Sequence, residues 1–135
     1  MLPRRLSPGT DLRQTGAVAT WQKLQIKPGQ TVAVLGLPRG VELGLPDEVT
    51  VTTDAATADG VLAFVASAAE LGGARPAIDA ARADRLAWIA YPKGGQLATD
   101  LNRDRLADLV RAEGAQPVRQ ISLDDTWSAL RFRPG

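Results

Sequence analysis

The chain has 135 residues, 44% of them hydrophobic, with a formal net charge of +1. This composition predicts a folded core and gives no electrostatic reason to expect nucleic acid or an anionic membrane as a partner. Cysteine and histidine are absent from the sequence, which excludes disulfides, thiolate nucleophiles, histidine-based dyads and ordinary zinc sites. Acid–base chemistry would fall to Asp, Glu, Lys or Tyr91. We predict no metal site and assign no catalytic residue.

The charges are unevenly spread along the chain. Residues 1–30 hold five Lys/Arg and one Asp, whereas residues 31–80 hold two Lys/Arg and seven Asp/Glu. We therefore expect a flexible basic arm at 1–15 and a single α/β domain at 16–135. The arm is solvated, pairs with the acidic middle, or contacts phosphate; a weaker hypothesis is nucleic-acid association through Arg4, Arg5, Arg13, Lys23 and Lys27. The sequence shows no signal peptide or membrane-length apolar run, so a cytoplasmic location is expected. Its richness in Ala, Arg and Gly and its scarcity of Lys indicate a GC-rich bacterial genome.

Hydrophobic patterning predicts the elements in chain order. A short helix at 17–25 and a turn at 27–30 lead into a strand at 31–35. Residues 37–47 contain two prolines and two glycines and allow at most one helical turn. Strands follow at 49–53 and 61–65, then one bent helix or two short pieces from Ser67 to Ala83, with Glu70 completing a capping box. A strand at 86–91 and a helix at 103–113, capped by Asn102, precede an antiparallel hairpin of strands 118–123 and 127–133.

The first strand ends in a turn that departs from a nucleotide-binding fingerprint. Residues 31–40 read T-V-A-V-L-G-L-P-R-G. A G-x-G-x-x-G loop needs a second glycine two positions after the first, where backbone approaches phosphate. That place holds Pro38, which has a ring and no N–H to donate. The sequence therefore predicts a nucleotide-type scaffold with a degenerate phosphate loop.

The element order predicts a mostly parallel α/β sheet in three layers, ending in an antiparallel hairpin. This order resembles a truncated class I methyltransferase, or Rossmann-type, fold. From about Trp21 to the C-terminus the chain also resembles a small bacterial family of unknown function with that truncated architecture. The matching stretches are Lys27-Pro28-Gly29, Tyr91-Pro92-Lys93, residues 99–101 (T-D-L) and residues 125–131 (D-T-W-S-A-L-R). The resemblance implies the fold and no established activity.

Ligands of open parallel sheets bind at the carboxyl ends of the strands. The candidate cofactor-binding residues at this edge are Gly36, Arg39, Asp54, Lys93, Asp125 and Trp127. Each has a structural alternative. Asp54 is spaced to accept ribose hydroxyls or is a turn carboxylate, and Lys93 neutralises an anion or pairs with Asp124 or Asp125. One of these two adjacent aspartates forms the turn, unless both converge on magnesium. Trp127 and Trp88 are expected to pack in the core, with stacking on a ligand as the alternative for Trp127.

Two functional hypotheses follow. The first is a non-catalytic domain that needs no cofactor and acts through an unidentified protein partner or as a homodimer. The alternative is a methyltransferase-like protein that binds S-adenosylmethionine or a nucleotide at the carboxyl edge, since methyl transfer depends mainly on positioning.

Overall fold

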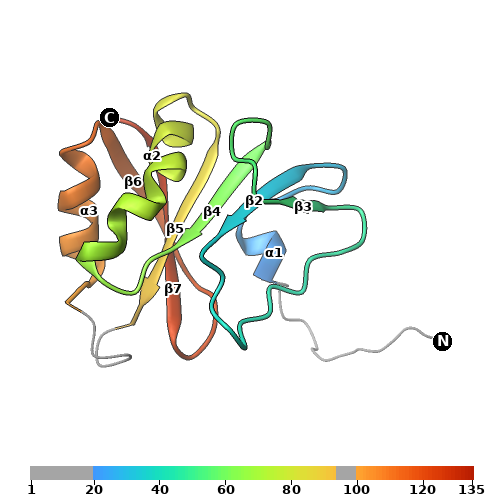
Figure 1. Ribbon diagram of the computed structural model, residues 1–135, viewed down its shortest axis with the longest axis horizontal. Helices are drawn as coiled ribbons and strands as arrows, with labels where there is room; N and C mark the ends of the chain where they lie inside the picture. The colour runs from blue at the N-terminus through green and yellow to red at the C-terminus, as the bar shows by residue number, and fades with distance from the viewer. Residues whose placement is uncertain (1–19, 94–99) are drawn as a thin grey trace.

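The computed structural model describes residues 20–93 and 100–135. Its strands are β2 (Thr31–Leu35), β3 (Thr50–Thr52), β4 (Gly60–Phe64), β5 (Leu86–Pro92), β6 (Ala115–Ser122) and β7 (Trp127–Pro134). They form one sheet in the order β3-β2-β4-β5-β7-β6 (Figure 1). Strands β3, β2, β4 and β5 are parallel, and β7 is antiparallel to β5 and β6. The predicted truncated, methyltransferase-like α/β fold with a C-terminal hairpin is confirmed.

Some predictions fall outside the described part of the chain. These are the arm at 1–15, the beginning of the helix predicted at 17–25, and residues Gly94, Gly95 and Thr99. Of the first helix, the structure describes α1 (Thr20–Lys23).

The strand order reverses between β2 and β4. The connection from β2 to β3 passes over one face of the sheet, where it buries Leu43 and Val49. The return from β3 to β4 passes over the other face, where it buries Ala58. Right-handed crossovers in opposite directions must use opposite faces. The carboxyl ends of β2 and β4 therefore flank the switch point, where α/β proteins bind ligands.

Two apolar layers cover the sheet and complete the predicted three-layer arrangement. One contains the buried stripes of α2 (Arg75–Arg82) and α3 (Arg103–Arg111), including Ile78, Leu106 and Val110. The other contains Leu24 and residues of the 36–49 connection, packed on side chains such as Trp88. Because residues 36–49 form no helix, this second layer is made mostly of loop, as their prolines and glycines predict.

The segment from Ser67 to Ala83 forms two short helices, which is one of the two predicted outcomes. The first piece is a 3₁₀ helix, η1 (Ala68–Ala74), and α2 follows directly. The predicted capping by Ser67 is wrong, because its side chain makes no cap hydrogen bond. The Ala68 N–H instead donates to Asp100 Oδ1 at 2.8 Å, and Glu70 Oε1 accepts from the Ala66 N–H at 2.9 Å. An acceptor from a distant segment therefore replaces the local cap.

Asn102 caps α3 as predicted. Its side chain accepts a hydrogen bond from the Arg105 N–H at 2.8 Å. We expect Asn102→Ala to lower the free energy of unfolding by about 1 kcal/mol, because one N–H of the first turn loses its acceptor. Urea unfolding measures this loss, and Asn102→Asp, which keeps an acceptor, is the matched control. Equal stability of the alanine variant and the parent chain would contradict the capping role.

The strand boundaries differ from the predicted ones by up to three residues. Strand β6 begins at Ala115 and contains a register irregularity between Pro117 and Arg119. Strand β3 is shorter than predicted, because the Val49 N–H donates to Pro46 O in a turn before the strand begins. The sheet therefore has two dissimilar edges, a short β3 and a long β6 with an irregular register.

Candidate functional site

Three segments meet at the carboxyl ends of the parallel strands, in the lower part of Figure 1. They are the turn after β2, the residue after β5, and the turn between β6 and β7. The Lys93 N–H donates to Thr126 O at 2.8 Å, which fixes the second segment on the third. A hollow of about 320 Å³ lies between the first segment and the hairpin turn. We call it the carboxyl-edge hollow.

The carboxyl-edge hollow brings two of the predicted residues together. Arg39 and Trp127 line it, along with Pro38, Asp124 and Thr126. Arg39 is exposed, and Pro38 has no N–H to present to the hollow. The hollow therefore combines one exposed cation with a carboxylate. Val41 also lines it, and its N–H already donates to Pro38 O at 3.2 Å.

Gly36 directly follows β2 and has a left-handed backbone, at φ +68°. A Cβ placed on it would lie 2.9 Å from the carbonyl oxygen of Phe64, at the end of the neighbouring strand β4. This distance is below any normal carbon–oxygen contact, so a side chain at position 36 would displace backbone. Position 36 therefore requires glycine because its backbone lies close to the neighbouring strand of the sheet.

Trp127 is only 4% exposed, although it borders the hollow. Its ring meets the ring of Phe64 edge-on, with centroids 5.3 Å apart. Trp88 is buried as well, and its Nε1–H donates to Leu24 O at 2.8 Å. Both tryptophans therefore pack in the core, which is the role predicted for Trp88 and one of the two roles predicted for Trp127.

Asp124 forms the hairpin turn. Its Oδ1 accepts from the Thr126 N–H at 2.8 Å and from the Trp127 N–H at 2.7 Å. This is the turn role predicted for one of the two aspartates. Asp125, the residue predicted to bind a ligand, is exposed in the same turn. Because Asp124 Oδ1 already accepts two amide hydrogen bonds, Asp124 and Asp125 do not converge on one metal ion.

Lys93 interacts with a hydroxyl in place of a carboxylate. Its Nζ donates to Ser122 Oγ at 2.8 Å, and this hydroxyl donates to Asp124 O at 3.2 Å. The alternative pairing with Asp124 or Asp125 is wrong, since neither carboxylate forms an ion pair with Lys93 in the described structure. The lysine thus joins the end of β5 to the end of β6.

Asp54 lies apart from the carboxyl-edge hollow. It lines a different hollow, of about 390 Å³, between the loop after β3 and the start of α2. Its Oδ1 accepts from the Ala56 N–H at 3.1 Å, and its own N–H donates to Thr52 Oγ1 at 3.1 Å. These hydrogen bonds are typical of a carboxylate that stabilises its own turn. The structure therefore separates Asp54 from Arg39 and Trp127.

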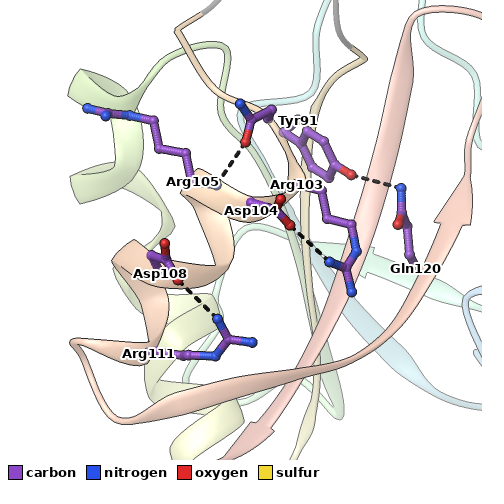
Figure 2. Close-up of polar contacts among 8 residues, drawn as sticks. Tyr91, Arg103, Asp104, Arg105, Asp108, Arg111 and Gln120 are labelled. Atoms are coloured by element: carbon purple, nitrogen blue, oxygen red, sulfur yellow. Dashed lines mark hydrogen bonds and ion pairs between the residues drawn. The ribbon is translucent and has the colours of Figure 1, made fainter.

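Tyr91, the sequence's only tyrosine, is buried between the sheet and α3. Figure 2 shows its hydroxyl toward Gln120, whose Nε2 donates to it at 3.0 Å. Burial raises the pKa of Tyr91 above its usual 10.0, against the smaller lowering effect of a hydrogen bond with Ser128. The phenol is therefore protonated at neutral pH and satisfied within the protein, which does not suit a general base.

The sequence interpretation missed two features. Arg85 donates from Nη1 to Ala55 O and Ala58 O, both at 2.9 Å, and so holds the loop between β3 and β4. An apolar hollow of about 190 Å³, which we call the β3-edge hollow, is lined by Val34, Leu37, Leu43, Leu45 and Val51. Its signal was the run of leucines at 37, 43 and 45 within a loop.

Within residues 20–93 and 100–135, no three acidic side chains gather closely enough to hold a metal ion. The helices of this same portion are all too short or too polar to traverse a bilayer.

Solved structures are the one kind of known protein to which the chain shows similarity. Neither a family model nor a curated protein sequence matches the chain. The chain is similar in structure to a ribosomal protein L11 methylase from Lactobacillus delbrueckii subsp. bulgaricus, with 16% identity and a TM-score of 0.43. The similarity covers 97% of this chain and 91% of that one. The strand order and directions, rather than this likeness, define the fold.

Proposed function

We propose that this chain is a non-catalytic α/β domain that acts by contact with a protein partner or with a second copy of itself. The observation that carries the proposal is the closed turn after β2. Gly36 lies under the Phe64 carbonyl, Pro38 offers no amide, and the connection beyond contains no helix. A helix N-terminus with free amides is what holds an anionic cofactor at this place in related folds.

The residues present do not fit S-adenosylmethionine or a nucleotide, the groups that the fold class suggests. An acidic residue would have to reach the ribose from the end of the second parallel strand. Asp54 stands at that point but lines a separate hollow and holds its own loop. Trp127 is buried on Phe64, so its ring face is not free to stack on an adenine.

The resemblance to a small bacterial family belongs to this proposal, and so does a cytoplasmic location. Two stretches that carry the resemblance lie side by side in the sheet. Tyr91 is opposite Ser128, and Pro92 is opposite Trp127. Because these two stretches pair in the sheet, the residues that carry the resemblance have a structural role, namely the pairing of β5 with the hairpin.

A cofactor titration tests the proposal. We expect the melting temperature to stay unchanged with S-adenosylmethionine, S-adenosylhomocysteine or ATP at millimolar concentration. A ligand at a hundred times its Kd would stabilise the fold by about 2.7 kcal/mol, which a melting curve resolves. Asp54→Asn is the matched variant, because it would weaken the binding only of a ligand whose ribose contacts the Asp54 carboxylate.

A clear rise in melting temperature with one of these ligands, abolished in Asp54→Asn, would contradict the proposal and support the cofactor-binding hypothesis. A rise that persists in Asp54→Asn would also contradict the proposal, and would return Gly36, Arg39, Lys93, Asp125 and Trp127 to consideration as ligand contacts.

A further inference from the structure

Strand β3 leaves one edge of the sheet open. The Thr50 N–H donates to Gln30 O, on the side of β2, at 3.0 Å. Because successive residues of a strand direct their amides to opposite sides, the N–H and C=O of Val51 face away from β2. No strand of the described chain lies on that side, since β3 is the outermost strand of the sheet.

The two edges of the sheet differ in how they are protected. Proteins block pairing at an edge with proline, bulges and charged side chains. Strand β6 carries Pro117, a register irregularity and Arg119. Strand β3 reads Thr-Val-Thr and pairs with β2 in regular register. Shortness is the one such protection that β3 has. Of the two edges, the β3 edge is therefore the one that can accept another strand.

An apolar hollow adjoins the open edge. Val51 is 55% exposed and Leu37 is 47% exposed, and both line the β3-edge hollow. Leu43, which is buried, lies deeper in the same hollow. An apolar side chain from an added strand can enter here and gain burial. Since β3 spans only three residues, such side-chain contacts must supply much of the affinity.

The surroundings of the edge are acidic. Residues 40–74 contain six Asp/Glu and no Lys or Arg. Asp47 and Glu48 precede β3, Asp54 follows it, and all three are exposed. Within the described structure none of these carboxylates takes part in an ion pair. A strand bound here would lie between two acidic ends, which favours basic side chains in the partner.

The same charges disfavour a second copy as the occupant. A two-fold axis at Val51 would place Glu48 of each copy opposite Asp54 of the other. Like charges directly opposite one another destabilise a strand pair.

We infer that the β3 edge binds an extended segment of a partner protein in which apolar residues alternate with Lys or Arg. This inference rests on the proposed function and makes it more specific. The added strand pairs with the Val51 backbone, one of its apolar side chains fills the β3-edge hollow, and its basic side chains face Asp47, Glu48 and Asp54.

The test uses a short synthetic peptide of alternating lysine and valine, titrated into the full chain. Heteronuclear NMR is expected to show the Val51 amide becoming protected from hydrogen exchange, because that N–H gains an acceptor. Affinity should fall as salt is raised. Val51→Lys should weaken binding about tenfold or more, since it removes the apolar contact and repels the lysines. Val118→Lys, on the exposed β6 edge, is the matched control and should bind as the parent does.

Several outcomes would overturn the inference. Absence of binding at millimolar peptide, equal loss in both lysine variants, or equal binding of an alternating glutamate–valine peptide would each do so. Binding that appears only after deletion of residues 1–19 would assign the edge to the chain's own N-terminal segment. A dimer that Val51→Lys converts to a monomer would overturn the inference and leave the proposed function standing, whereas cofactor binding would overturn the proposed function itself.

Discussion

Trp88→Ala is expected to lower the free energy of unfolding by about 3–5 kcal/mol, the largest effect of any substitution considered. The ring is 1% exposed at the centre of the sheet, on strand β5. Its removal leaves a cavity among Leu24, Leu62 and neighbouring side chains. It also leaves Leu24 O without the Nε1–H donor that now lies at 2.8 Å. A buried acceptor without its donor adds a desolvation cost of about 1–3 kcal/mol.

Urea unfolding of Trp88→Ala and Trp88→Phe separates these two effects. The phenylalanine variant keeps most of the ring and loses the N–H, so its loss of stability should be clearly smaller. A small domain is stable by about 5–15 kcal/mol in total, so the alanine variant can approach complete unfolding. Equal losses in the two variants would show that the hydrogen bond, rather than the volume, dominates at this position.

Gly36→Ala is expected to lower the free energy of unfolding by more than about 2 kcal/mol. A left-handed backbone at φ +68° penalises any side chain. In addition, the new methyl group would meet Phe64 O at 2.9 Å, and this oxygen belongs to backbone that cannot rotate away. Relief therefore requires β2 and β4 to separate at their carboxyl ends.

Gly40→Ala is the matched control for Gly36→Ala. Gly40 lies in the same turn at φ +85°, and an added Cβ there meets nothing within 4 Å. Its substitution should cost only the left-handed penalty, about 1–2 kcal/mol. The difference in unfolding free energy between the two variants measures the contact with Phe64 O. If both variants lose the same amount, the contact is not what requires glycine at position 36.

Hydrophobic patterning was sufficient to predict the central strands. The run at 31–35 matches β2 in both boundaries, and β4 differs from its predicted range by one residue at each end. Both strands are buried on two faces, which requires a continuous apolar run that is visible in the sequence. The hairpin was predictable as well, because only a few residues separate β6 from β7 and antiparallel pairing follows.

Features that join distant segments could not be predicted. Asp100 caps η1 from 32 residues away, and Arg85 holds two loop carbonyls that lie 30 and 27 residues earlier. Neither contact leaves a local pattern. The candidate site was limited in the same way. Strand order placed Arg39 and Trp127 at one edge, but the spacing of Asp54 from Gly36 did not reveal that its loop turns toward α2.

The contacts that hold the residues just after α1 affect the order in which the chain folds during its synthesis. Leu24 O is held by Trp88, and the Gln25 side chain accepts a hydrogen bond from Arg131 Nη1. These partners are synthesised 64 and 106 residues later. At about 5–20 residues per second, the segment around α1 emerges many seconds before its last partner does. This segment therefore completes its docking only after Arg131 has left the ribosome, and it should be more open to proteases in nascent chains that lack Arg131.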